Sequence, residues 1–201
     1  MTDPSNGYEG IAPEFLAGRG SAPSTGVGAR HVREWASTLP RGAAVIDLGC
    51  GSGIPITREL IRQSLNVYAM DASPSMVNAF RQNFPEIPVA CESVQDSLFF
   101  IRRFDGVLSW GLMFLLLAEQ QRHLIQRFAD ILVPGGRLLF TSPPEREVWS
   151  DAMTGLESRS LGAAEYRNQL SAVGLTVTRE YEDEGENHYY EAVKNGNTPI
   201  R

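Results

Sequence analysis

The stretch Val45-Ile46-Asp47-Leu48-Gly49-Cys50-Gly51-Ser52-Gly53-Ile54-Pro55 combines an apolar strand, a turn with three glycines and the expected start of a helix. Glycine lets a ligand approach the backbone closely, and it reaches positive φ without strain. The N-terminus of a helix adds free N–H groups and a partial positive charge. This order of elements predicts a binding site for a nucleotide-like ligand.

The spacing of the glycines narrows the choice of ligand. The run is G-x-G-x-G, whereas the dinucleotide fingerprint would need its third glycine where this chain has Ile54. Asp47 lies directly before the turn, and a carboxylate there would repel a diphosphate but attract a cation. Both residues count against a nicotinamide-dependent oxidoreductase, which is the alternative enzyme class.

Four segments in chain order resemble the class I S-adenosylmethionine (SAM) dependent methyltransferases. Residues 47–53 match D/E-x-G-x-G-x-G, and residues 71–76 are similar to D-x-S-x-x-M. Residues 104–110 resemble the F-D-x-V start of a fourth strand, and residues 132–138 resemble an L-x-P-G-G turn into a fifth. The resemblance implies a Rossmann-like fold, SAM as the cofactor, and an enzyme that transfers the methyl group of SAM.

Strands that alternate with helices predict an α/β fold with a doubly wound, mostly parallel sheet. The resemblance implies that this sheet has seven strands and that the last strand is antiparallel. The expected strands are 43–48, 66–70, 87–91, 104–110, 136–142, 175–181 and 188–194. The expected helices are 13–16, 24–39, 55–64, 74–83, 119–132 and 163–173.

Length and composition are those of one globular domain, with 201 residues, 42% hydrophobic and 21% charged. We expect an N-terminal arm and first helix at 1–39, a core at 40–194, and a lid at 143–161, since long loops tend to be functional. The net charge of −6 speaks against non-specific binding of nucleic acid. Without a signal peptide or a membrane-spanning run, the expected location is cytoplasmic. The absence of a His/Cys cluster predicts no metal site.

The resemblance implies specific cofactor contacts. Asp71 would accept hydrogen bonds from both ribose hydroxyls of SAM, or it would only cap the helix that follows. Met76 would pack on the adenine or belong to the core, Asp47 would support the methionine ammonium, and Arg19 would pair with the carboxylate. The expected cofactor-binding residues are Asp47, Gly49, Cys50, Gly51, Gly53, Asp71, Ala72, Met76, Glu92, Ser93, Val94, Ser109 and Arg19.

Methyl transfer is an in-line displacement in which positioning supplies much of the rate. Trp110, at the end of the expected fourth strand, would wall the transfer site or pack in the core. His188 would act as a general base or lie on the surface of a hairpin. Tyr8, on the arm, would reach the substrate or belong to an ordinary flexible terminus.

The preferred interpretation is a SAM-dependent methyltransferase that modifies an oxygen or nitrogen of a small-molecule acceptor. Acidity, the lack of an appended recognition domain, and the short arm and lid favour a small acceptor. Methylation of tRNA or protein is the first alternative, and a basic rim near Trp110 would favour it. A non-catalytic SAM-binding regulator is the second, because the glycine turn and Asp71 indicate binding and not turnover.

Overall fold

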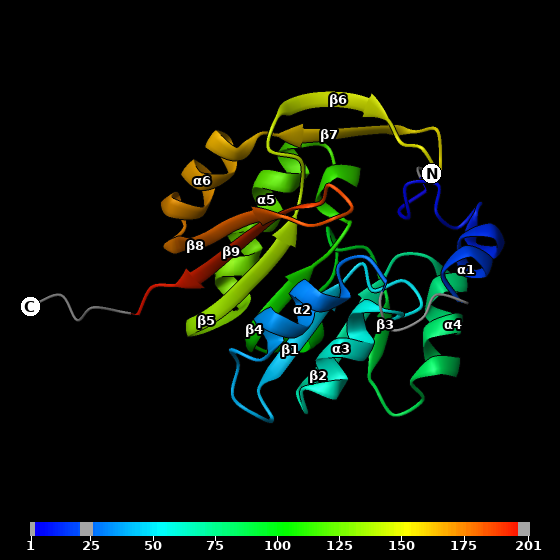
Figure 1. Cartoon of the computed structure of the whole chain (residues 1–201), viewed down its shortest axis with the longest axis horizontal. Coiled ribbons are helices and arrows are strands. Elements are labelled where there is room, and N and C mark those ends of the chain that lie inside the picture. Colours follow the sequence, from blue (N-terminus) through cyan, green and yellow to red (C-terminus); the bar gives the residue numbers. More distant parts are fainter. Residues whose placement is uncertain (1–2, 21–25, 197–201) are drawn as a thin grey trace, which may run out of the picture.

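The structure is a computed structural model that describes residues 3–20 and 26–196, without the side chains of residues 19 and 20. One sheet of seven strands has the order β3-β2-β1-β4-β5-β9-β8 (Figure 1). Its strands are β1 (Ala44–Leu48), β2 (Asn66–Asp71), β3 (Val89–Cys91), β4 (Phe104–Ser109), β5 (Leu132–Thr141), β8 (Leu175–Glu182) and β9 (His188–Lys194). Adjacent strands run parallel, except that β9 is antiparallel to β5 and β8. The predicted sheet with its antiparallel last strand is confirmed.

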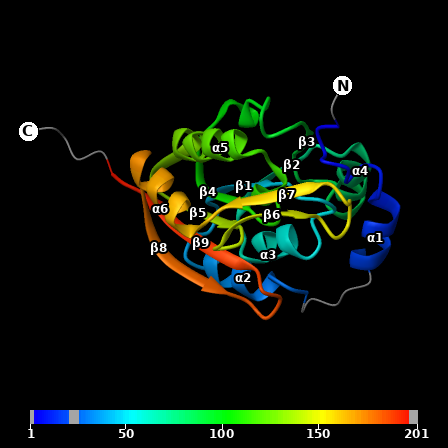
Figure 2. The same ribbon diagram turned by 90° about the horizontal axis from the view of Figure 1, so that it is seen from above.

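Helices cover both faces of this sheet (Figure 2). The helices are α1 (Ala12–Gly20), α2 (Ala29–Ala36), α3 (Ile56–Arg62), α4 (Pro74–Asn83), α5 (Ala118–Ile131) and α6 (Ala163–Ala172), with short 3-10 turns η1 (Phe99–Ile101) and η2 (Met113–Leu115). Seen from above, α2 and α3 lie on one side of the sheet and α5 lies on the other. Among the described residues, no helix is both long and apolar enough to cross a membrane.

The alternation of side chains along β1 decides which residues can reach the site. All five residues of β1 are buried, because β2 and β4 flank the strand and helices cover both of its faces. Val45 shares a hydrophobic cluster with Leu60 of α3, whereas Ile46 shares one with Phe128 of α5. Asp47 therefore faces the same side as Val45, where α3 begins.

Two further segments lie beyond the carboxyl ends of the parallel strands (Figure 1). The strands β6 (Arg146–Ser150) and β7 (Glu157–Leu161) form a separate antiparallel hairpin within the expected lid segment. The N-terminal segment, residues 3–20, consists of turns followed by α1. A Cβ on Gly7 would lie 3.0 Å from Leu156 Cδ1. The N-terminal segment therefore packs closely against the turn of this hairpin.

Two elements, α2 and β5, begin at least about four residues from their predicted starts. The helix expected at 24–39 is α2, and residues 21–25 lie outside the described part of the chain. Gly28 precedes α2 with a φ of 83°, and a Cβ there would lie 2.7 Å from Trp110 Nε1. The indole of Trp110 thus occupies space that only glycine leaves free. β5 begins at Leu132, before the predicted 136, because it pairs with Phe104 before a shift of register.

Candidate functional site

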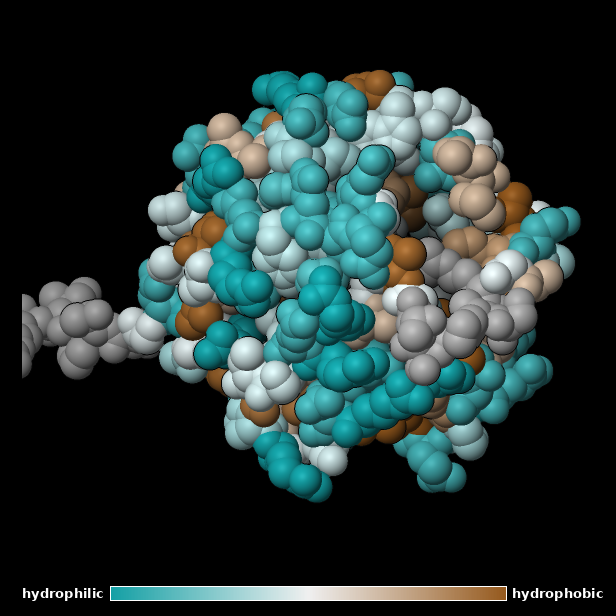
Figure 3. Space-filling model, viewed as in Figure 1, coloured by the Kyte–Doolittle hydropathy of each residue, from teal (hydrophilic) through white to brown (hydrophobic). Residues whose placement is uncertain are grey.

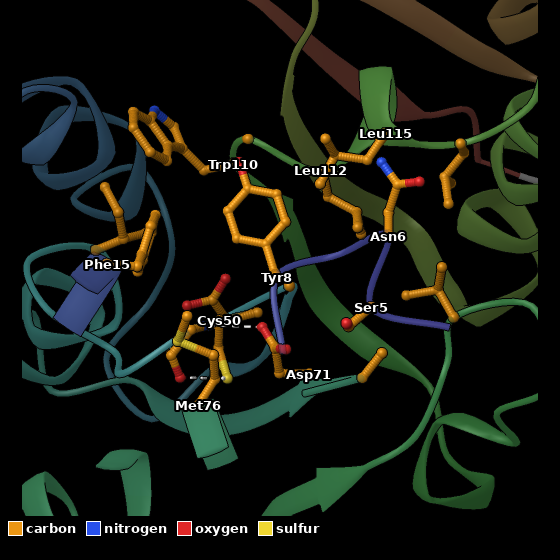
Figure 4. Close-up of a pocket in the computed structure, with 18 of the residues that line it drawn as sticks. Ser5, Asn6, Tyr8, Phe15, Cys50, Asp71, Met76, Trp110, Leu112 and Leu115 are labelled. Atoms are coloured by element: carbon orange, nitrogen blue, oxygen red, sulfur yellow. Dashed lines mark hydrogen bonds between the residues drawn. The ribbon is translucent and has the colours of Figure 1, made fainter. Parts of the chain in front are cut away.

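A cavity of about 210 Å³ opens at the carboxyl ends of β1, β2 and β4. In the space-filling view, a hollow with hydrophobic residues at its edge lies between the β6–β7 hairpin and the N-terminal segment (Figure 3). The glycine turn and the ends of β1 and β2 line one part of the cavity. The N-terminal segment and the chain after β4 line much of the rest (Figure 4). Open α/β sheets bind their ligands at this edge.

Gly51 and Gly53 have different functions in the glycine turn. The Gly49 N–H donates to the Met70 carbonyl at 2.9 Å, which holds the turn against β2. Gly49, Gly51 and Gly53 have φ values of 73°, 55° and 78°, a region that other residues enter only with strain. Gly51 borders the cavity, whereas a Cβ on Gly53 would lie 2.5 Å from Phe84 Cε2. Gly51 keeps the cavity open, and Gly53 allows the turn to pack on α4.

Asp71 connects the glycine turn to the start of α4. Its Oδ2 accepts the Gly51 N–H at 2.8 Å, and its Oδ1 accepts the Ser73 N–H at 2.9 Å. Burial raises the pKa of Asp71, and these backbone hydrogen bonds oppose that rise. The N-cap of α4 is Ser73, whose Oγ accepts the Met76 N–H at 3.2 Å. Asp71 therefore does not cap the helix itself, and its oxygens keep acceptor capacity toward the cavity that it lines.

Asp47 is a buried carboxyl group at the edge of the cavity, with 1% of its surface exposed. Thr57, in the first turn of α3, donates its hydroxyl to Asp47 Oδ2 at 2.5 Å. Burial raises the pKa of Asp47 to about 7, the charge of Asp71 adds to this, and the hydrogen bond from Thr57 opposes it. Near neutral pH the carboxyl is thus partly protonated, and a cation bound beside it would favour the ionised form.

The cavity is acidic. The carboxyl groups of Asp47, Asp71 and Glu92 line it, and no Lys, Arg or His is among the described residues that do so. The apolar side chains of Met76 and Val94 line it as well. An acidic cavity with an apolar section suits a ligand that combines a positive charge with a ring system. Among the described residues, no group of three or more acidic, His or Cys side chains could hold a metal ion.

The other residues predicted to bind the cofactor are distributed as follows. Ala72 and Cys50 line the cavity. Ser93 does not line it, but its hydroxyl donates to the side-chain oxygen of Gln95, which does. Ser109 is fully buried and lies outside the lining. The side chain of Arg19 lies outside the described part of the structure.

The three candidate catalytic residues are in different places. Trp110 lines the cavity, and its Nε1 donates to Tyr189 Oη at 2.9 Å. Tyr8 lines the cavity as well, and its ring lies among the other side chains in Figure 4, between Trp110 and Cys50. His188 does not line the cavity, because β9 places its ring 3.6 Å from Glu180 and 3.4 Å from Glu182. Of the three candidates, only Trp110 and Tyr8 lie at the cavity.

The N-terminal segment is docked at the site through Glu9. This carboxylate accepts the Ser75 N–H at 3.0 Å and the Ser75 hydroxyl at 2.8 Å, and it also accepts the Ser73 hydroxyl. Hydrogen bonds from Ser73 and Ser75 lower the pKa of Glu9. Tyr8 contacts Phe15 edge to face, with 5.5 Å between ring centres. Glu9 therefore binds the start of α4 and holds the neighbouring Tyr8 at the cavity.

Several lining residues have no counterpart in the sequence prediction. They are Pro4, Ser5, Asn6, Ser52, Ile54, Ile56, Gln95, Gly111, Leu112, Phe114, Leu115, Leu116 and Asn187. Those of η2 could have been found from the apolar run after Trp110, which directly follows a strand end at the binding edge of the sheet. Asn187 lies in the turn between β8 and β9, and no local pattern connects it to the cavity.

The chain is similar to known methyltransferases. Residues 45–136 match a family model described as a methyltransferase domain. Aklanonic acid methyltransferase DauC of Streptomyces sp. is 33% identical over 111 residues, which cover 51% of this chain and 49% of that protein. A ribosomal protein L11 methyltransferase of Burkholderia thailandensis is 26% identical over 178 residues, which cover 84% of this chain and 53% of that protein. The chain spans about half the length of the curated relatives it matches.

A solved structure extends the likeness to nearly the whole chain. It is the crystal structure of a magnesium protoporphyrin IX methyltransferase from Synechocystis PCC 6803 with bound SAM. The TM-score is 0.75 at 16% identity, and the match covers 97% of this chain and 98% of that chain. At this identity the likeness shows a shared fold.

Proposed function

We propose that this chain is a class I methyltransferase and that it transfers the methyl group of SAM to an oxygen or nitrogen of a small molecule. One observation carries the proposal. Asp47, Asp71 and Gly51 lie around one cavity at the carboxyl ends of parallel strands, although they come from separate segments of the sequence.

The lining residues fit the parts of SAM. The Asp71 carboxylate offers acceptors to the ribose hydroxyls, and Met76 and Val94 offer apolar surface to the adenine. Asp47 and the backbone at Gly49 would hold the methionine end, whose ammonium is a cation. When bound, SAM supplies a methyl group activated by a positively charged sulfur.

The protein's own contribution is to bind, to orient and to exclude water. The carboxylates of Asp47, Asp71 and Glu92 favour a cationic cofactor over an anionic competitor. Trp110 and Tyr8 would then contact the acceptor and hold it in line with the methyl group, since positioning supplies much of the rate of such a displacement. We leave His188 out of this machinery because its ring lies beside Glu180 and Glu182.

A protein acceptor is the second candidate, because two of the matched relatives are named ribosomal protein L11 methyltransferases. The described lining does not favour it, since the N-terminal segment lies over the cavity and would have to move before a folded protein could enter. DauC, whose name states that it methylates aklanonic acid, is the relative that favours a small acceptor.

The experiment that tests this proposal uses SAM with an isotope-labelled methyl group. The protein is incubated with labelled SAM and a cell extract, and the products are separated by size. Label in the small-metabolite fraction, absent when Gly51→Val replaces the wild type, would support the proposal. Label in protein or RNA would contradict the small acceptor, and no label despite measurable SAM binding would favour a non-catalytic regulator.

We predict that S-adenosylhomocysteine, which carries the same ammonium as SAM, binds more tightly as pH rises from 6 to 8. The free protein has a raised pKa at Asp47, about 7, so that the carboxylate attracting this cation forms across that interval. If S-adenosylhomocysteine binds only the protein whose Asp47 is ionised, its affinity rises about tenfold between these two pH values. Calorimetric titration of the wild type and Asp47→Asn measures the effect, and a slope that persists in Asp47→Asn would assign it to another group.

The same raised pKa has the opposite effect on the stability of the free fold. Because the folded pKa of Asp47 lies above its unfolded value, the folded state binds this proton more tightly. The contribution of Asp47 to the free energy of unfolding is therefore highest at low pH. It decreases as pH rises from about 4 to about 7. Added S-adenosylhomocysteine should raise the melting temperature more at pH 8 than at pH 6.

We predict that Glu9→Ala releases the N-terminal segment from α4 and speeds the dissociation of S-adenosylhomocysteine. The substitution removes the acceptor for Ser73 and Ser75 while leaving the sheet and its core unchanged. We expect a dissociation rate about fivefold or more above wild type, which corresponds to about 1 kcal/mol. Stopped-flow displacement measures this rate. Glu14→Ala, an exposed change in α1, is the matched control and should dissociate at the wild-type rate.

A further inference from the structure

Asn187 lines the cavity with an amide whose orientation is fixed from outside the cavity. It is in the turn between β8 and β9, and its Nδ2 donates to both carboxylate oxygens of Asp183, at 3.0 and 3.1 Å. A carboxylate only accepts, so the NH₂ group of Asn187 must face Asp183. The amide oxygen then points the other way, and no donor among the described residues is bonded to it.

Asp183 orients a second lining residue through Tyr189. The Tyr189 hydroxyl donates to Asp183 Oδ2 at 2.7 Å and accepts the Trp110 Nε1–H at 2.9 Å. Burial opposes ionisation of Asp183, but hydrogen bonds from Tyr189, Asn187 and Gly185 outweigh it and lower its pKa. One ionised carboxylate thus positions both Asn187 and the ring of Trp110, which lie on different loops.

The remaining lining restricts the charge of an acceptor. The carboxyl groups of the cavity belong to Asp47, Asp71 and Glu92, and the described lining holds no cationic side chain. An anionic acceptor would therefore find no cationic side chain among the described lining residues, and the carboxylates would repel it. Trp110 and the η2 residue Phe114 provide apolar aromatic surface, which suits a ring system.

We propose that Asn187 is a specificity-determining residue of the methyl-acceptor site. Its amide oxygen accepts a hydrogen bond from an N–H or O–H group of an uncharged ring compound, and the ring packs against Trp110. Asp183 acts as a positioning residue, because it fixes both Asn187 and Tyr189. This inference rests on the proposed function, because it assigns the space beside the SAM site to the acceptor.

Three related probes test the inference on the unaltered protein. The full chain, saturated with S-adenosylhomocysteine at pH 7.5, is titrated with 2-naphthol, 2-methoxynaphthalene and 2-naphthoate, and binding is followed by saturation-transfer NMR. We expect 2-naphthol to bind about fivefold more tightly than 2-methoxynaphthalene, which lacks the donor, and 2-naphthoate to bind weakest. Equal or tighter binding of 2-naphthoate, or binding of none of the three, would overturn the proposal.

A substitution then assigns the preference to one side chain. In Asn187→Leu, which has similar size and no acceptor, the ratio of the 2-naphthol and 2-methoxynaphthalene affinities should fall to about one. Asn187→Ala tests the same point if the leucine variant does not fold. Asn195→Leu is the matched control, because Asn195 is exposed beyond β9 and bonds to Thr176. It should keep the wild-type ratio.

The titration also separates this inference from the proposed function. Failure of the wild type to bind S-adenosylhomocysteine would contradict the SAM site itself. Normal binding of S-adenosylhomocysteine, together with an unchanged probe ratio in Asn187→Leu, would contradict only the role of Asn187. Asp183→Asn should reduce the probe ratio as well, while the affinity for S-adenosylhomocysteine stays within about twofold of wild type.

Discussion

Gly51→Val is expected to abolish binding of S-adenosylhomocysteine while the chain stays folded. A Cβ at this position would have Phe15 Cε1, at 4.0 Å, as its nearest neighbour outside the adjoining chain, so the valine would project into the open cavity. The φ of 55° adds strain of about 1–2 kcal/mol, which a folded domain can tolerate. We expect an affinity loss of at least about a hundredfold, or about 2.7 kcal/mol, measured by calorimetry.

Gly53→Val is the control that separates an effect on binding from an effect on folding. A Cβ there would lie 2.5 Å from Phe84 Cε2 and 2.8 Å from Phe80 Cε2. The main effect of this substitution should therefore be a loss of stability. Thermal unfolding followed by circular dichroism should therefore show a large decrease in melting temperature for Gly53→Val. The decrease for Gly51→Val should be small. A folded Gly51→Val that still binds S-adenosylhomocysteine would mean that the cavity is not the cofactor site.

Asp71→Ala is expected to weaken SAM binding by at least about tenfold, or about 1.4 kcal/mol, without unfolding the chain. The substitution removes the acceptors that we assign to the ribose hydroxyls. Folding should survive, because burial already disfavours the Asp71 charge and Ser73 still caps α4. The freed N–H groups of Gly51 and Ser73 can be hydrated from the cavity beside them.

Asp105→Ala is the matched control for Asp71→Ala. Asp105 is also an aspartate in a strand of the sheet, and its Oδ2 accepts the Ala44 N–H at 2.8 Å at the start of β1, away from the carboxyl ends of the strands. Its removal should lower stability while leaving SAM affinity within about twofold of wild type. An unchanged affinity in a folded Asp71→Ala would remove Asp71 from the binding site.

The residues that we assign to the cofactor were predictable as neighbours in space because they follow strand ends. In a parallel sheet the carboxyl ends of adjacent strands meet at one edge, so Asp47 and Asp71 come together once the strands are placed. The resemblance of residues 47–53 and 71–76 to methyltransferase motifs then placed Gly51 and Met76 at the same edge. No knowledge of long-range packing was needed for these residues.

At the end of β4, the position after a strand is not enough to predict which residues line the cavity, because side chains alternate between the two faces of the sheet. Successive side chains of a strand point to opposite faces, so two consecutive residues at its end need not both reach a cavity. Ser109 is buried, and Trp110, the next residue, lines the cavity. The sequence analysis assigns both to the site, because it places them at one strand end without assigning each side chain to a face of the sheet.

The part of the cavity that we assign to the acceptor depends on contacts that no local pattern encodes. Glu9 meets Ser75 across 66 residues, and Asn187 reaches the cavity only after β9 has paired between β5 and β8. The hairpin strands at 146–150 and 157–161 also escaped prediction, since β6 is mostly exposed and shows no apolar alternation. These parts of the site follow from tertiary packing.

The most direct test of the central claim is a calorimetric titration of the whole chain with SAM at pH 8, with NAD⁺ titrated in parallel. The glycine spacing and the carboxyl group of Asp47 predict that one SAM binds per chain and that NAD⁺ gives no binding heat. Binding of NAD⁺ in place of SAM, or of neither compound, would contradict the assignment of this cavity to SAM.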